Sequence, residues 1–265
     1  MLINTVILFL KDLLPIFILC CLLKANLANT HMSRRAIGLI ILASVIGIFV
    51  TFKLLPYISE LWGGAGIEII NTVEILFVYL ALGVTASFTI KKQPPTNQQL
   101  FVIAAAFVVF IVLNTSIFII FLESYLSNSE SANIVVAGLT IGFGISLSFS
   151  ALLLFFLLWL NKKNYRVVTY SFWTLFLTGQ LSEVINLLQQ VDIVNTSGAL
   201  WDSSSFIADS SEYGHLLNAL VGYEAQPSFE FITLYSMSLF MLISYYFCYA
   251  QNETDEPMDK RVEKK

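Results

Sequence analysis

Charged residues are scarce in this sequence of 265 residues: they make up 12%, whereas an ordinary soluble domain carries about 25%. A soluble core cannot absorb a chain that is 57% hydrophobic, but lipid can. The 14 Lys and Arg form no basic stripe, which excludes nucleic acid as a partner. The composition therefore predicts an integral membrane protein whose first partner is the lipid bilayer.

Cysteine and histidine are also few, with three Cys and two His. Cys20 and Cys21 are adjacent in the first apolar run and Cys248 lies in the last, so none has a metal-ligand spacing. We interpret them as apolar filler, with metal or redox use as the minor alternative. His215 fits a surface loop better than a metal site. Nucleophile–base pairs and nucleotide-binding loops are missing too, so we expect neither an enzyme nor a permanently bound cofactor.

Seven apolar runs are long enough to span a bilayer core as helices of about 20 residues. Strands are disfavoured, because nothing alternates with period two and an open sheet cannot satisfy its backbone in lipid. The first run is not a signal peptide, since it has no basic start, Lys11 interrupts it, and no cleavage site precedes Asn29. The predicted fold is all-α, with spans at 2–23, 36–57, 67–90, 99–124, 133–161, 167–190 and 228–250.

Basic residues fall on alternate connections between these runs. The groups are Lys24, Arg34 and Arg35, then Lys91 and Lys92, then Lys162, Lys163 and Arg166, and finally the tail with Lys260, Arg261, Lys264 and Lys265. The other connections carry only acidic residues. The positive-inside rule then predicts a multi-pass protein of the cytoplasmic (inner) membrane, N-terminus out and C-terminus in.

One transmembrane domain, 1–250, accounts for most of the chain. Its longest connection, 191–227, is predicted to lie outside, and its apolar stretch His215–Val221 either rests on the membrane surface or caps a vestibule. The polar tail 251–265 has the composition of a disordered segment.

Ionisable residues at membrane depth are costly, so each needs a reason. Asp12, Glu74 and Glu183 are the candidate transit ligands for a metal cation, and interhelical hydrogen bonding or pairing with Lys11 is the alternative. For Glu68 the structural interpretation is preferred, because it lies near the outer interface. We expect Lys11 to pair with Glu74 or Glu183, since Asp12 points elsewhere on the helix.

Two further groups of polar residues accompany these charges. Gln180, Glu183, Asn186 and Gln190 form a stripe at helical spacing. Asn114, Thr115 and Ser116 lie at mid-depth, as candidate neutral oxygen donors or as helix-packing residues.

A more specific pattern lies near the last span. It contains Trp201-Asp202-Ser203-Ser204, then Gly214-His215-Leu216-Leu217-Asn218-Ala219-Leu220-Val221-Gly222-Tyr223, then Pro227-Ser228. This resembles the C-terminal signature of the oxidase-dependent iron permeases, the fungal high-affinity iron permeases and their bacterial homologues. The stretch from Gly179 to Gln190 is also similar to that family's sixth helix, with Gln189 at a usual Gln and Asn186 where His is common.

The resemblance implies seven helices and iron as the transported substrate. In that family, helices 1 and 4 each carry Arg-Glu-Gly-Leu-Glu, whose glutamates are held to bind iron. This chain departs from both, with Lys11-Asp12-Leu13-Leu14-Pro15 at the first site and Asn114-Thr115-Ser116-Ile117-Phe118 near the second. Ferric iron prefers carboxylate oxygen, so both motifs are degenerate as iron sites.

Helices 1–3 and 4–6 are expected to form two repeats of three helices, and an odd number makes the repeats inverted. The clusters at 11–12 and 114–116 should then meet near mid-membrane, where transporters of this kind bind substrate.

Two functions follow from these observations. The first is an iron-permease-like transporter of a metal cation. The alternative is a non-transporting membrane subunit of permease fold that docks a periplasmic iron-binding or oxidase protein through 191–227.

Overall fold

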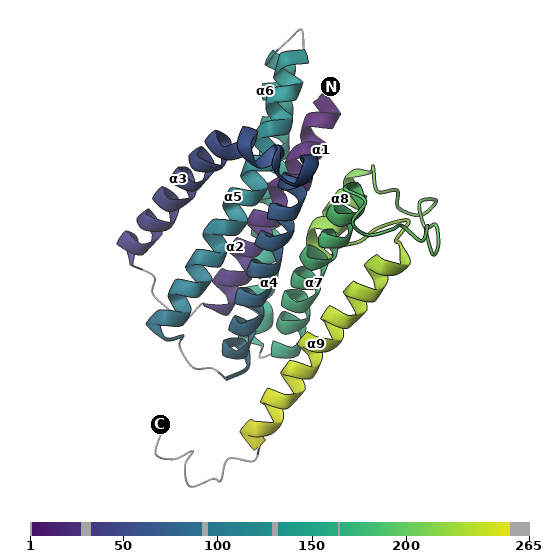
Figure 1. Cartoon of the computed structure of the whole chain (residues 1–265). Coiled ribbons are helices and arrows are strands. Elements are labelled where there is room, and N and C mark those ends of the chain that lie inside the picture. Colours follow the sequence, from purple (N-terminus) through teal and green to yellow (C-terminus); the bar gives the residue numbers. More distant parts are fainter. Residues whose placement is uncertain (1, 28–32, 92–94, 129–131, 164, 255–265) are drawn as a thin grey trace.

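The computed structural model describes residues 2–27, 33–91, 95–128, 132–163 and 165–254, and almost all of them are helical (Figure 1). Within this part there is no strand, only an isolated bridge between Ala199 and Ser228. The prediction of an all-α protein is confirmed. The elements are α1 (Leu2–Asp12), α2 (Leu14–Asn26), α3 (Arg34–Ser59), the 3-10 helix η1 (Leu61–Gly64), α4 (Gly66–Lys91), α5 (Asn97–Asn128), α6 (Ala132–Lys162), α7 (Arg166–Gln190), α8 (Glu212–Val221) and α9 (Phe229–Thr254).

Six helical segments are long and apolar enough to cross a membrane. They are Leu2–Asn26, Arg34–Ser59, Gly66–Gly83, Asn97–Ser124, Asn133–Lys162 and Phe229–Phe247. The predicted multi-pass membrane protein is confirmed at this level. The helix ends lie close to those predicted, except that α9 continues to Thr254, into the predicted tail; residues 255–265 lie outside the described part.

The predicted sixth span, 167–190, is the helix α7, which is not among these six. α7 is the central helix, and it packs against α4, α6, α8 and α9. Trp173, Phe176 and Leu177 are fully buried in the main hydrophobic core. Because protein surrounds this helix, it can carry polar residues that a lipid-facing helix cannot.

The first predicted span is confirmed as one apolar segment, Leu2–Asn26, but it is interrupted at Leu13. α1 ends at Asp12 and α2 begins at Leu14, with Pro15 in the first turn of α2. Proline has no N–H, so Pro15 cannot donate to the carbonyl of Lys11, and its ring clashes with that turn. The break therefore falls at the two charged residues of this span.

α8 contains the predicted apolar stretch His215–Val221 and packs on the other helices of the bundle. It packs against α1, α2 and α7. Its end is held close to α7 at Gly179 and Gly222, where a Cβ on Gly179 would lie 2.5 Å from the Gly222 nitrogen. Gly222 also closes α8 with φ of 70°, a conformation that favours glycine.

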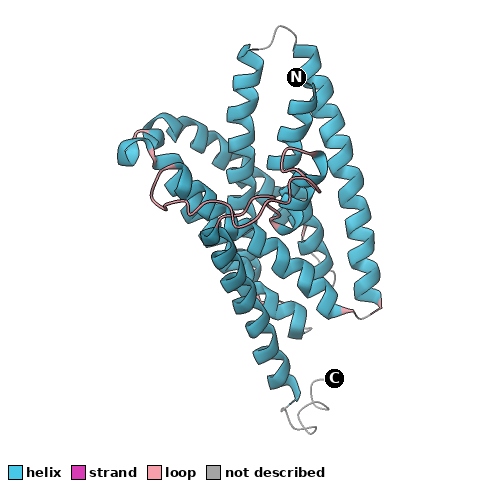
Figure 2. Ribbon diagram, turned by 90° about the vertical axis from the view of Figure 1, so that its right-hand side faces the viewer, coloured by secondary structure: helices cyan, strands magenta, loops and turns pink. Residues whose placement is uncertain are grey.

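The connection between α7 and α9 is a hydrogen-bonded loop that lies across the helices (Figure 2). The Tyr223 hydroxyl donates to the Ile207 carbonyl at 2.9 Å. Asp202 accepts from the Ser204 amide and from Gln226 Nε2, both at 2.9 Å. Asp209 accepts from the Ala225 amide at 2.8 Å. These bonds tie the segments before and after α8 to each other.

Replacing Gly179 with alanine should loosen this α7–α8 contact. The added methyl group meets the backbone of Gly222, which cannot move aside like a side chain, so we expect destabilisation of roughly 1–3 kcal/mol. Thermal unfolding of the detergent-solubilised protein measures it. Gly144→Ala on α6 is the control, because nothing lies within 4 Å of its added methyl. Equal melting temperatures for the two variants would contradict the close contact.

Candidate functional site

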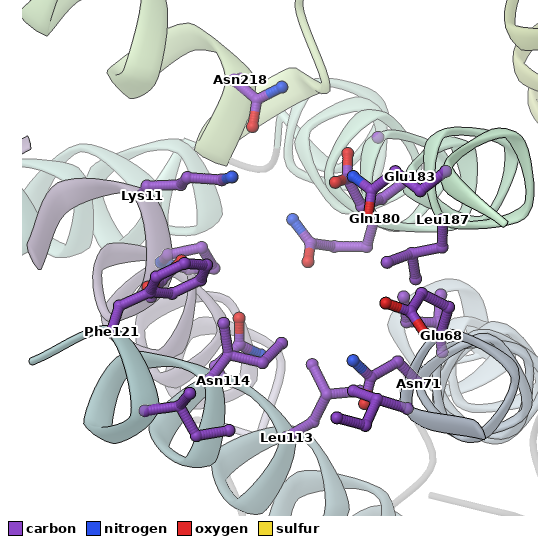
Figure 3. A pocket seen from close by; sticks show the side chains of 18 residues that line it. Lys11, Glu68, Asn71, Leu113, Asn114, Phe121, Gln180, Glu183, Leu187 and Asn218 are labelled. Atoms are coloured by element: carbon purple, nitrogen blue, oxygen red, sulfur yellow. The ribbon is translucent and has the colours of Figure 1, made fainter. Parts of the chain in front are cut away.

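A cavity of about 330 Å³ lies between α1, α4, α5, α7 and α8, and also reaches Pro15 at the start of α2 (Figure 3). Apolar residues such as Ile75, Leu113 and Ile117 form part of its wall. Polar side chains form the rest. They are Lys11, Asp12, Glu68, Asn71, Asn114, Gln180, Glu183, Gln190 and Asn218. A polar cavity of this size inside a helical bundle holds water or a hydrated ligand.

Asp12 is a buried carboxylate of the cavity, with 6% of its surface exposed. Its Oδ2 atom accepts no hydrogen bond from the described residues, and neither does Oε2 of Glu68. Glu183 accepts a hydrogen bond from Asn186 Nδ2 at 3.1 Å. Two of the three carboxylates therefore keep an oxygen that is free to bind a ligand.

Lys11 supplies the positive charge of the cavity. Its side chain extends into the cavity toward Glu183 (Figure 3), and it interacts electrostatically with both Glu183 and Asp12. Of the two partners expected from the sequence, the structure thus places Glu183 opposite Lys11, and Glu74 does not line the cavity.

The break between α1 and α2 orients these charges. Lys11 lies in the last turn of α1, where its own carbonyl finds no donor in Pro15 and so favours a cation. Asp12 is the last residue of α1, and the amides of Leu13 and Ile16 after it are bonded to the carbonyls of Phe9 and Leu13. A helix without Pro15 would leave no such carbonyl unbonded beside the cavity.

The predicted ligand residues are only partly brought together. Asp12, Glu183 and Asn114 line the cavity, whereas Glu74, Thr115 and Ser116 do not. On α5, Leu113, Asn114, Ile117 and Phe121 share the cavity face, and this turns Thr115 and Ser116 toward other faces. Asn114 Nδ2 donates to the Phe110 carbonyl at 2.9 Å, which leaves its oxygen for the cavity. No group of three His, Cys, Asp or Glu among the described residues is arranged to hold a metal ion.

Glu68 is the main functional candidate that the sequence analysis set aside. It faces the cavity together with Asn71, one turn further along α4. The spacing of Glu68, Asn71 and Glu74 indicated a polar side of this helix, but not which carboxylate faces inward. Asn218 of α8 was not among the predicted site residues, although capping of a vestibule was one of the two positions considered for the stretch His215–Val221.

His215 lies on α8, partly buried and outside the predicted spans. Burial, and then the positive charge of Lys11, lower its pKa from the usual value. The imidazole is therefore neutral near pH 7 and adds no charge beside the cavity.

Glu224 is a partly buried carboxylate in the loop after α8. Burial raises its pKa to about 7, and the negative charges of Glu183 and Asp209 add to the effect. Glu224 does not line the cavity, and its Oε2 accepts no hydrogen bond from the described residues. Its ionisation therefore destabilises the folded protein.

Comparison with family models, curated proteins and solved structures finds no match. The resemblance to the oxidase-dependent iron permeases therefore stays a prediction. The structure adds one observation: the residues that carry it, among them Asp202, Gly222 and Tyr223, build the loop and its packing.

A pH titration of stability should isolate Glu224. Because its folded pKa is raised from 4.5 to about 7, its contribution to stability falls as the pH rises through that window. Glu224→Gln removes the destabilisation caused by ionising this buried carboxyl group. The melting temperature of the variant should therefore rise relative to that of the wild type as the pH rises across the same window. Glu123→Gln, at an exposed position, is the control and should show a constant difference. A pH-independent difference for Glu224→Gln would contradict the assignment.

Proposed function

We propose that this protein is a permease that moves a divalent metal cation across the cytoplasmic membrane, with iron as the first candidate substrate. The observation that carries the proposal is the cavity that combines Lys11, Asp12, Glu68 and Glu183 beside a broken helix. Ionisable residues inside a membrane protein mark substrate or ion pathways more often than structural ties. Broken helices whose ends face a central site are a recurrent feature of secondary transporters.

The charge of the cavity favours a divalent ion. Three carboxylates and one ammonium group give a formal charge of −2 when all are ionised. A divalent cation neutralises that charge, whereas a trivalent one leaves an excess positive charge in a medium of low dielectric constant. Asp12 and Glu183 are the proposed transit ligands, with Asn114 as a neutral oxygen donor. The cavity is larger than a bare ion, so the ion would keep some of its water.

We further propose seven crossings, with α7 as the sixth. The start of α1 and the end of α9 lie at opposite ends of the bundle (Figure 1), which supports an odd number of crossings. With the N-terminus outside, all basic groups between spans face the cytoplasm, and the connection 191–227 faces outward. The meeting of Lys11 and Asp12 with Asn114 in one cavity supports the inverted repeat of helices 1–3 and 4–6.

Fusions of a topology reporter test this arrangement. A reporter after Gly198 should be active outside, and one after Lys163 should be active in the cytoplasm, because the positive-inside rule places the basic connections there. Reporter activity in both compartments is measured for each fusion, with equal amounts of protein as the control. The opposite result at either point would overturn the number of crossings or their direction.

Uptake of radiolabelled ferrous iron and manganese into proteoliposomes tests transport. Asp12→Asn should abolish uptake and Glu183→Gln should strongly lower it, because each removes charge from the proposed ligand set. Glu74→Gln is the matched control: it makes the same chemical change on a membrane helix, but its side chain does not line the cavity. It should keep wild-type uptake.

Each outcome of this assay discriminates. Folded wild-type protein that moves neither metal would refute the permease. Equal losses of uptake in Asp12→Asn and Glu74→Gln would refute the assigned ligands, but not the proposal that the wild-type protein is a permease.

A second function, docking of a periplasmic iron-binding or oxidase partner, is favoured by one observation. The outer loop is held by hydrogen bonds and yet exposes Trp201, Phe206 and Tyr213. Trp201→Ala should abolish co-purification of such a partner. Tyr223 is a poor probe for the same purpose, because its hydroxyl is bound inside the loop.

A further inference from the structure

A second and larger cavity, of about 640 Å³, lies between α2, α3 and α5. It exists because α3 packs against α5 and α4 but leaves a space between itself and α2. Figure 1 shows α3 inclined away from the other helices. Only 6% of the spanning part of α3 is buried. This cavity shares no lining residue with the polar cavity described above.

The wall of this second cavity is hydrocarbon along its length. Residues such as Ile16, Leu23, Ile41, Ile48 and Phe107 form it. Ser44 also lines it, but its hydroxyl donates to the Ile40 carbonyl of its own helix at 2.9 Å. A polar ligand would find no partner there, whereas an acyl chain would.

One end of the cavity is basic. Lys24, in the last turn of α2, is the only charged residue among those that line it, and no carboxylate does so. Arg34 begins α3 on the same face as Ile37 and Ile41, which line the cavity, so it lies one turn beyond them toward the same end. Lys24 and Arg34 are both exposed.

We propose that this cavity binds an anionic phospholipid, with an acyl chain between α2 and α3 and the phosphate against Lys24 and Arg34. The apolar wall favours binding of the acyl chain, and the two cations at one end favour a negatively charged head group. The lipid fills the space that α3 leaves and so attaches this outer helix to the bundle. The proposal does not depend on transport through the polar cavity.

Native mass spectrometry of the delipidated, detergent-solubilised protein tests this site. The full-length protein is titrated with phosphatidylglycerol or with phosphatidylcholine of the same acyl chains, and the association constant of the first bound lipid is measured. We expect the wild type to prefer phosphatidylglycerol. A surface cation contributes about fivefold to the binding of an anionic lipid. Lys24→Gln and Arg34→Gln should therefore each lower the association constant of phosphatidylglycerol by about that factor and leave that of phosphatidylcholine unchanged.

Two further variants separate the site from general surface charge. Lys53→Gln makes the same change near the opposite end of α3, away from the cavity lining, and should leave both constants unchanged. Ala104→Phe places a ring in the cavity and should weaken both lipids. Equal binding of the two lipids by the wild type, an equal loss in Lys53→Gln and Lys24→Gln, or full binding by Ala104→Phe in folded protein would each overturn the proposal.

Discussion

A charged group inside a membrane is stable only where protein or water surrounds it, and this chain keeps one ammonium and three carboxylates in a single cavity. Much of the architecture follows from this requirement. The helices α1, α4, α5 and α7 and the short helix α8 enclose the cavity, and α7, which supplies Gln180, Glu183 and Gln190, is covered by its neighbours. The helices α3, α6 and α9, which do not line the cavity, expose large apolar side chains instead.

The same requirement explains which parts of the fold the sequence could predict. Long apolar runs and breaks between them are local features, so the helices were located to within a few residues. The break in the first span was missed, because the apolar run continues through it and only Pro15 marks it. α7 illustrates the opposite case: its polar stripe was visible in the sequence, and its low apolarity reflects burial by protein, not exposure to water.

The sequence predicted several of the polar residues that line the cavity, but not which side of each helix faces it. Asp12 and Glu183 were recognised because a carboxylate at membrane depth is unusual at any rotation of its helix. The choice between Glu68 and Glu74 depends on which side of α4 faces inward, and that is decided by the contact of α4 with α7 and α5. Asn218 was beyond local inference, because its position depends on the approach of Gly222 to Gly179, far apart in the sequence. Most residues of the loop signature, in turn, hold α8 and its neighbouring segments, and Asn218 is the signature residue that lines the cavity.

The unequal number of positive and negative groups in the polar cavity has an electrical consequence. With every group ionised, the empty cavity is doubly negative, and the divalent ion proposed above would make it neutral. The membrane potential acts on charge, at about 2.3 kcal/mol per elementary charge per 100 mV, so it would exert no net force on the loaded cavity and a large one on the empty one. In a membrane that is negative inside, that force would draw the empty cavity toward the outer side. For the proposed permease, the energy of the potential would then enter the transport cycle in the return of the empty carrier, and not in the step that carries the metal.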